Sequence, residues 1–170
     1  MHKIYTIGHS NHTQEKFLDL LTKAHIDFIV DVRSNPNSRW ATFANRGELE
    51  KVLESSGIDY LYLGNELGGH PSDPDCYDAQ TGDVNYLAIR EKEYFKRGIK
   101  RILDHLKGHN VCIMCAEEDP SNCHRHLLIG ASLSQKGITI LHVRGDGRIQ
   151  TDEDLWKDTV GVSNNQIRLL

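Results

Sequence analysis

Seven side chains able to do acid–base, nucleophilic or ligand chemistry crowd into the segment from Ile113 to Arg125. They are two thiols, three carboxylates, an imidazole and a guanidinium, namely Cys115, Glu117, Glu118, Asp119, Cys123, His124 and Arg125. An apolar run at 111–114 precedes the group, and apolar residues at helical spacing follow it at 127–133. This pattern predicts a junction where a buried strand leads into a helix, which is where α/β proteins bind ligands.

Cys115 and Glu117 are the candidates for catalysis within this segment. A cysteine nucleophile reacts as the thiolate, which needs nearby positive charge, whereas the neighbouring acids disfavour it. A carboxylate held beside apolar residues can act as a general acid or base. The alternatives are a buried structural cysteine and a solvated acid that pairs with Arg125. Cys112 falls on the opposite face of the strand and is expected in the core.

The three residues Cys123, His124 and Arg125 are expected in the first turns of the following helix. That helix is predicted to begin at Pro120, with Asp119 as its N-cap, and to continue to about residue 135. Free backbone N–H groups at a helix N-terminus favour an anion, so these residues are predicted to bind an anionic group.

Metal binding is the other chemistry that Cys115, Cys123 and His124 suggest. Their C-x7-C-H spacing is not that of a zinc finger or ribbon, so the sequence assigns no metal ligand. It leaves the cofactor open, and also whether Cys115 and Cys123 bind a metal or form a redox pair. His126 is expected to face solvent or to pack.

The other predicted strands also end in polar residues, and parallel strands bring such ends to one edge of the sheet. The candidate ligand-binding residues outside the 113–125 segment are Ser10, Asn11, Asp31, Arg33, Arg39, Gly68 and Gly69. His9 is a candidate proton carrier, and Arg33, Arg39 and Arg125 are expected to hold an anion. Asp31 and Arg33 lie on one side of their strand, so a structural pair between them is an equal alternative.

Apolar runs alternate with helical patterns along the chain. Strands are predicted at 4–7, 28–32, 58–63, 111–114 and 138–143, and helices at 17–24, 48–53, 86–106, 120–135 and 152–158. Such alternation predicts an α/β fold: a mostly parallel sheet of about five strands with helices on both faces. A partial or distorted β/α barrel is the alternative. Residues 65–84 form a long polar loop of unassigned role.

Composition sets broad limits on the class of protein. With 170 residues, 38% hydrophobic, we expect a single domain over 1–150, and 151–170 as its C-terminal extension. A net charge of −4 does not favour nucleic acid, although nucleic acid remains an alternative partner. No apolar run is long enough to span a membrane, no signal-peptide pattern is seen, and the four cysteines suggest free thiols, so a cytoplasmic location is expected.

Several ordered motifs resemble the bacterial and archaeal family called domain of unknown function 488. They are Thr6-Ile-Gly-His-Ser10, Asp31-Val-Arg33 with Pro36, Ser38 and Arg39, Leu67-Gly-Gly69 with Pro71, and Cys115-x-Glu117-x-x-Pro120-x-x-Cys123-His-Arg125. The resemblance spans Thr6 to about Val143. It implies an α/β fold and one pocket built from these motifs, without an established reaction.

The leading functional hypothesis is an enzyme acting on a small anionic or nucleotide-like ligand at the strand ends. Cys115 or Glu117 would do the chemistry. The alternatives are a non-catalytic module that binds a nucleotide or nucleic acid, and a metal-binding protein. The sequence leaves the substrate, the reaction and the oligomeric state open.

Overall fold

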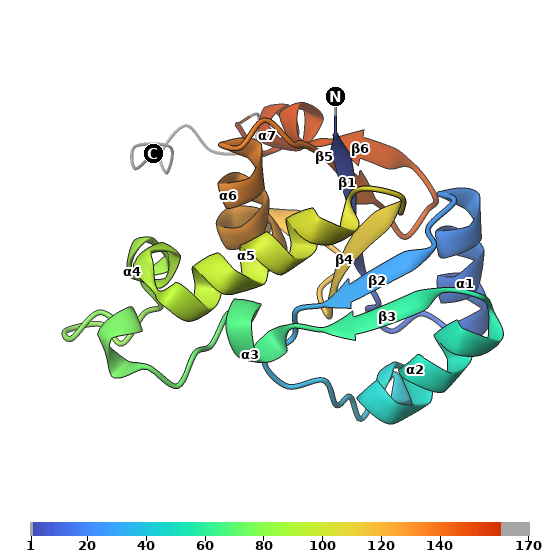
Figure 1. Ribbon diagram of the computed structural model, residues 1–170, viewed down its shortest axis with the longest axis horizontal. Coiled ribbons are helices and arrows are strands. Elements are labelled where there is room, and N and C mark those ends of the chain that lie inside the picture. The colour runs from blue at the N-terminus through green and yellow to red at the C-terminus, as the bar shows by residue number, and fades with distance from the viewer. Residues whose placement is uncertain (1, 161–170) are drawn as a thin grey trace.

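The fold is a six-stranded sheet with helices on both faces, seen in a computed structural model that describes residues 2–160 (Figure 1). The strand order is β3-β2-β4-β1-β5-β6. The strands are β1 (Lys3–Gly8), β2 (Phe28–Asp31), β3 (Asp59–Tyr62), β4 (Val111–Cys115), β5 (Thr139–Val143) and β6 (Ile149–Thr151). The first five pair in parallel and β6 pairs antiparallel with β5, so the α/β prediction is confirmed.

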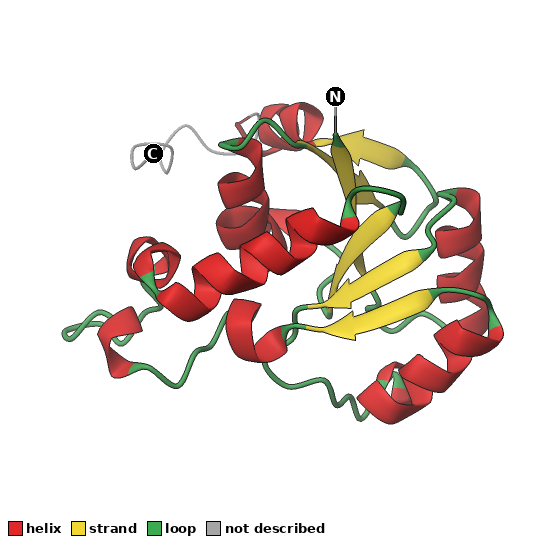
Figure 2. Ribbon diagram, in the orientation of Figure 1, coloured by secondary structure: helices red, strands yellow, loops and turns green. Residues whose placement is uncertain are grey.

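The helices divide between the two faces of the sheet (Figure 2). One face carries α1 (Gln14–Lys23) and α2 (Arg46–Ser55). The other carries α3 (Gly64–Leu67), α4 (Tyr86–Glu91), α5 (Glu93–His105), the π-helical segment η4 (Arg125–Gly130) and α6 (Ala131–Ser134). The last helix, α7 (Asp152–Val160), packs against β5 and β6.

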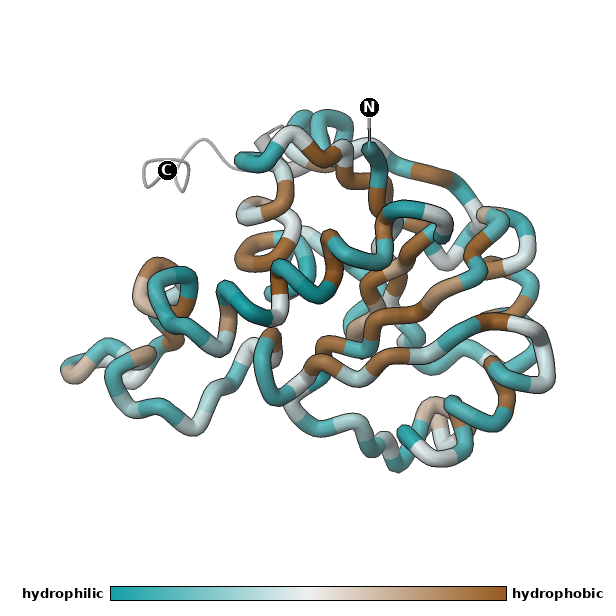
Figure 3. The backbone as a smooth tube through the Cα atoms, viewed as in Figure 1, coloured by the Kyte–Doolittle hydropathy of each residue, from teal (hydrophilic) through white to brown (hydrophobic). Residues whose placement is uncertain are grey.

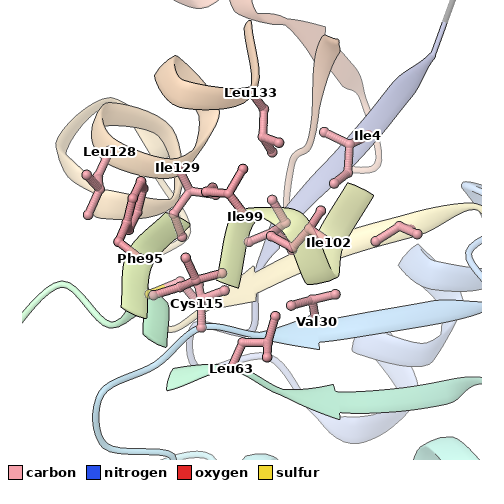
Figure 4. Packing of buried hydrophobic residues seen from close by; sticks show 14 of the residues in the cluster. Ile4, Val30, Leu63, Phe95, Ile99, Ile102, Cys115, Leu128, Ile129 and Leu133 are labelled. Atoms are coloured by element: carbon pink, nitrogen blue, oxygen red, sulfur yellow. The ribbon is translucent and has the colours of Figure 1, made fainter. Parts of the chain in front are cut away.

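Each face of the sheet has its own apolar core, because side chains alternate along every strand. Brown apolar stretches of the tube therefore run along the central strands and along the inner sides of the helices (Figure 3). On the α1/α2 face, Cys112 and Met114 of β4 are fully buried, which confirms Cys112 as a core residue. On the opposite face, Cys115 packs among residues of α5 and η4 (Figure 4), and Ile113 belongs to the same cluster.

The connections that follow β4 and its neighbours leave on opposite faces of the sheet. β1 and β2 flank β4, and their following helices, α1 and α2, lie on one face. The chain that leaves β4 instead enters η4 and α6 on the other face. A parallel sheet opens a crevice where neighbouring connections leave on opposite sides, and ligands bind there. The carboxyl end of β4 lies at this position.

One long helix expected at 86–106 is two helices in the structure. Lys92 separates α4 from α5 with an extended backbone (φ −73°, ψ 138°). Its ammonium group lies 2.7 Å from Asp73 Oδ2 and 3.3 Å from Asp75 Oδ2. The break therefore ties α4 to the segment expected as a loop at 65–84, which in the structure begins within α3 and contains a 3₁₀ turn, η2 (Pro74–Cys76).

The prediction of a helix from Pro120 to about residue 135 is wrong for the first residues of that range. Pro120–Asn122 forms only a 3₁₀ turn (η3), in which the Asp119 side chain accepts from the N–H of Ser121. Cys123 is then extended (φ −111°, ψ 138°), and helical structure resumes at η4. Because Cys123 lies between two helical turns rather than inside a helix, its side chain is free to face the end of β4.

Within residues 2–160, none of the helices has both the length and the apolar character that crossing a membrane requires.

Candidate functional site

Four side chains converge at the carboxyl end of β4, and we call Cys115, Glu117, Cys123 and His124 the thiol cluster. The Sγ atoms of Cys115 and Cys123 lie 2.8 Å and 3.1 Å from the same carboxylate oxygen, Oε2 of Glu117. The Nδ1 atom of His124 lies 3.7 Å from the first sulfur and 3.9 Å from the second. Both cysteines are buried, whereas Glu117 is exposed, so the cluster lies just below the surface.

A main-chain contact on the side of the His124 ring away from the thiols fixes the orientation of the ring. Its Nε2 atom lies 3.0 Å from the main-chain oxygen of Val32, which can only accept, so Nε2 carries the proton. Nδ1 then presents its lone pair to the two thiols when the ring is neutral. Gly69 allows this packing, because a Cβ atom there would lie 2.8 Å from Cγ of His124.

The donor atoms of Cys115, Cys123 and His124 all lie within 4.8 Å of one another. A tetrahedral zinc ion, with Zn–S bonds of about 2.3 Å and Zn–N bonds of about 2.0 Å, holds sulfur and nitrogen about 3.6 Å apart. The observed sulfur–nitrogen distances of 3.7 and 3.9 Å are close to that value. The spacing of these residues along the chain gave no sign of this ligand set, because the extended Cys123 produces it.

Hydrogen bonds set the protonation of the cluster. The pKa of the Cys115 thiol is raised by its hydrogen bond to Cys123, by burial and by the charge of Glu117. The pKa of Cys123 is lowered to about 5, first by the hydrogen bond from Cys115 and then by His124 and Arg125. Desolvation raises the pKa of Glu117, but hydrogen bonds from both thiols outweigh it and bring that pKa to about 2. The two sulfurs and the carboxylate of Glu117 therefore share their protons as one coupled group.

A second group of polar side chains lies on the α1/α2 face at the same edge of the sheet. Arg33 binds Asp31 through two nitrogens, Nε to Oδ1 at 2.9 Å and Nη2 to Oδ2 at 2.7 Å. Tyr60 also donates to Asp31 at 2.8 Å, and Nη1 of Arg33 lies 3.1 Å from Nε2 of His9. The structural pair between Asp31 and Arg33 is therefore present, and it is buried. Burial and the charge of Asp31 raise the pKa of Tyr60.

Arg125 does not face a ligand space. Its guanidinium is buried and donates to the main-chain oxygens of Glu117 at 2.5 Å and Glu118 at 2.7 Å. Its Nε donates to Thr6 Oγ1 at 3.4 Å. Gly8 approaches the same loop so closely that a Cβ atom would overlap the main-chain oxygen of Glu117. Arg125 and Gly8 therefore shape the loop that carries the Glu117 carboxylate.

The remaining predicted ligand-binding residues lie in loops that follow the strands. Ser10 takes a left-handed backbone conformation (φ 47°) beside Asn11 and donates to its side chain at 3.3 Å. Gly68 ends α3 against Ser34. Arg39 is exposed in the loop between β2 and α2, and it makes no hydrogen bond or ion pair with residues 2–160. Of the arginines expected to hold an anion, Arg39 is thus the one with an uncommitted guanidinium.

Comparison with known proteins identifies the family. The model of one family, described as "Domain of unknown function DUF488", matches residues 13–132. The chain belongs to the DUF488 family. The match includes the whole thiol cluster, whereas the motif at residues 6–10 lies before it. A search of curated proteins finds no match to the chain.

Sequence reasoning missed two features of this DUF488 protein. Tyr86 lies close enough to the thiol cluster that burial and then the charges of Cys123, Cys115 and Glu117 raise its pKa. His126, His142 and Asp152 form a second group of potential metal ligands. His126 is buried, so of the two expected environments only packing is observed. The sequence feature that could have pointed to this second group is His142, a histidine within a predicted buried strand.

Proposed function

We propose that this DUF488 protein is a zinc-dependent enzyme whose catalytic ion binds to Cys115, Cys123 and His124. The observation that supports this proposal is the convergence of two sulfurs and one oriented imidazole nitrogen on one point at the sheet edge. Catalytic zinc sites have three protein ligands and an open fourth position, and two cysteines with one histidine are a known set. Thiolate ligands also favour zinc over magnesium or calcium.

Glu117 is the residue proposed to move a proton in this site. Its carboxylate lies beside both sulfurs, on an exposed residue. A bound zinc would lower the pKa of a water to about 7 and polarise a substrate carbonyl or phosphoryl group. Both cysteines would then bind as thiolates, so the thiol hydrogen bonds that lower the pKa of Glu117 would be lost and its carboxylate would be able to accept a proton. Hydrolysis is the reaction class that fits this donor set.

The second shell of the proposed site is supplied by this chain. The main-chain oxygen of Val32 accepts from Nε2 of His124, an arrangement that typically orients a histidine ligand. Arg125 and Gly8 hold the loop of Glu117 in place. We assign Arg33 and Arg125 to positioning, because their donors are already used inside the protein.

The substrate proposed from the sequence, a small anionic or nucleotide-like molecule, would depend on Arg39. A salt titration of nucleotide binding tests this part separately. Nucleotide binding that depends weakly on salt and is lost in Arg39→Ala supports a small anion. Binding of DNA or RNA that weakens steeply with salt supports the nucleic-acid alternative.

Metal analysis with matched cysteine variants tests the proposal. We expect wild-type protein to retain zinc, Cys115→Ser and Cys123→Ser to lose it, and Cys76→Ser to keep it. Cys76 is a suitable control because it is also a buried free thiol, but it contacts Tyr94 rather than the cluster. Glu117→Gln should keep the metal and lose zinc-dependent hydrolysis of a probe ester such as 4-nitrophenyl acetate. Loss of zinc in Glu117→Gln would instead make Glu117 a fourth ligand and the site structural.

A dithiol redox centre is the second candidate, because the Cys115 and Cys123 sulfurs lie within 4.8 Å of each other. It predicts zinc-free protein that forms a Cys115–Cys123 disulfide under mild oxidation. In such a centre His124 would lower the pKa of the Cys123 thiol, but Glu117 would have no catalytic role, so the zinc proposal accounts for more of the geometry. Intact mass before and after oxidation, measured with zinc content, separates the two.

A further inference from the structure

A second cluster of ligand atoms lies beside β5, and one of its members, His126, is two residues from His124 of the thiol cluster. His126 comes from η4, His142 from β5, and Asp152 is the first residue of α7. Nδ1 of His126 lies 2.8 Å from Oδ1 of Asp152, and Nε2 of His142 lies 3.2 Å from the same oxygen. The three ligand atoms all lie within 4.8 Å of one another. In Figure 1, α6, β5 and α7 meet at this end of the molecule.

The contact between His126 and Asp152 is short but poorly aligned. Nδ1 of His126 is buried 2.8 Å from the carboxylate, yet within residues 2–160 no partner meets the angular requirements of a hydrogen bond to it. A buried polar atom without a partner costs free energy, so such atoms call for an explanation. A cation that binds Nδ1 and the carboxylate oxygen together would satisfy both.

His142 is supported in the way that a metal ligand usually is. Its Nδ1 atom lies 2.8 Å from the hydroxyl oxygen of Thr6, and both residues are fully buried. When Nδ1 donates to this hydroxyl, the lone pair of Nε2 points towards Asp152. A second-shell oxygen that fixes the tautomer of a histidine in this manner is a common feature of metal sites. Nε2 of His142 lies 3.2 Å from Oδ1 of Asp152, a position that a proton occupies in one tautomer and that a cation can occupy in the other.

His126 and Asp152 also line a cavity of about 740 Å³. This volume falls within the range of about 300–1,000 Å³ that is typical of sites for small organic ligands. The cavity walls are mainly apolar and aromatic, from residues that include Val84, Tyr86, Leu87, Leu127 and Trp156. Arg90 and three aspartates, Asp78, Asp83 and Asp152, supply the charge. Carboxylates outnumber the arginine, so the lining does not favour an anion.

We propose that His126, His142 and Asp152 bind a divalent transition-metal ion whose open coordination positions face this cavity. Two imidazoles and one carboxylate suit Fe²⁺, Mn²⁺, Co²⁺ or Zn²⁺, and three protein ligands leave room for a substrate. The ligand class is a small, largely apolar molecule with one oxygen or nitrogen donor for the metal. This site goes beyond the proposed function and does not depend on it, since its ligands contain no sulfur. His142 and Asp152 also lie outside the segment that the family model matches.

Cobalt binding can count the two sites separately. Metal-free protein is equilibrated with Co²⁺, the bound ions are counted, and the sulfur-to-cobalt charge-transfer absorption reports on the thiol cluster alone. We expect two ions in wild-type protein. Asp152→Asn and His126→Gln should each bind one, with the sulfur absorption unchanged. The double variant Cys115→Ser/Cys123→Ser should also bind one, without that absorption.

Glu153→Gln is the matched control. It neutralises the next residue of α7, whose carboxylate is exposed and pairs with Lys157. This variant should bind two ions with wild-type affinity, whereas Asp152→Asn should weaken the second ion at least tenfold. Two ions bound with equal affinity by Asp152→Asn, His126→Gln and wild type would overturn the proposal. One ion in wild type, together with the sulfur absorption, would overturn it and leave the zinc proposal standing.

A measurement on the unchanged chain covers the case in which a variant fails to fold. Zn²⁺ is added to wild-type protein, and the imidazole resonances of the histidines are followed by NMR. Those of His126 and His142 should shift together as the second equivalent binds, while that of the exposed His70 should not. Absence of any shift at His126 and His142 would contradict the proposal.

Discussion

Arg125 donates a hydrogen bond of 2.5 Å to the main-chain oxygen of Glu117. A second bond reaches the oxygen of Glu118 at 2.7 Å, and Nε donates to Thr6 at 3.4 Å. Thr6 in turn lies 2.8 Å from Nδ1 of His142. A buried guanidinium therefore joins the loop of the thiol cluster to the second shell of the His126–His142–Asp152 cluster.

Replacing Arg125 with methionine should destabilise the protein and loosen the Glu117 loop. The buried loop oxygens would lose charged donors, and each such bond contributes about 1.5–3 kcal/mol. We expect the free energy of unfolding to fall by about 3 kcal/mol in urea titrations. Arg148→Met is the control, because Arg148 is exposed and pairs with the neighbouring Asp146; it should change stability by less than about 0.5 kcal/mol. Equal effects of the two substitutions would contradict a positioning role for Arg125.

Gly8→Ala tests the close approach between β1 and the same loop. The added methyl group would overlap the main-chain oxygen of Glu117, so the loop must move away from the strand end. We expect a loss of about 1–3 kcal/mol of stability, typical of overpacking, together with weaker zinc binding. Calorimetry and metal titration measure the two effects.

Gly47→Ala is the matched control for Gly8→Ala. A Cβ at Gly47 in α2 meets nothing within 4 Å, and alanine favours a helix over glycine by about 1 kcal/mol. It should therefore stabilise the protein slightly and leave zinc binding unchanged. If Gly8→Ala keeps the stability and the zinc affinity of the wild type, the predicted close contact between Gly8 and the Glu117 loop is wrong.

The periodicity of the sequence predicted most of the fold, because five strands and the main helices each bury an apolar face that is visible in the chain. The strand β2 is an example: Phe28–Asp31 follows the predicted range 28–32 within one residue. The sixth strand, Ile149–Thr151, was missed because three residues carry no usable alternation. The break between α4 and α5 at Lys92 was not predicted, because ion pairs to a loop distant in sequence set the backbone there.

The sequence predicted where the candidate site lies on the sheet, but it did not predict which of its residues contact one another. Strand ends converge in any parallel sheet, so the position of Cys115 and Glu117 followed from the pattern. The meeting of Cys115 with Cys123 and His124 depends on the extended backbone of Cys123, which the expected helix from Pro120 would have prevented. Likewise, the sequence could not choose between a ligand and Asp31 as the partner of Arg33, since burial decided it.

Asp31→Asn should be among the most destabilising single changes in the chain. The substitution leaves the buried guanidinium of Arg33 without its bidentate partner and removes the charged acceptor of Tyr60. Breaking a buried ion pair costs about 3–5 kcal/mol. The control is Asp19→Asn, which breaks the exposed pair with Lys23 and should cost less than about 0.5 kcal/mol. Urea unfolding monitored by circular dichroism gives both values, and similar losses would refute the assignment.

His9 should make stability depend on pH. Burial, and then the positive charge of Arg33, lower the pKa of His9 from its ordinary value near 6.5. In the unfolded chain the imidazole takes up a proton as the pH falls below about 6.5, whereas in the folded protein it resists protonation. The stability linked to His9 is therefore present above that pH and is lost as the pH falls towards the lowered pKa.

We expect His9→Gln to reduce the loss of stability between about pH 7.5 and about pH 5.5 relative to wild type. Glutamine can still accept from Arg33 and donate to the main-chain oxygen of Ser10, both of which His9 contacts. His70→Gln changes an exposed imidazole and should leave the wild-type pH dependence intact. Urea midpoints at the two pH values provide the comparison. If His9→Gln loses as much stability as wild type over this interval, then His9 is not the group that resists protonation in the fold.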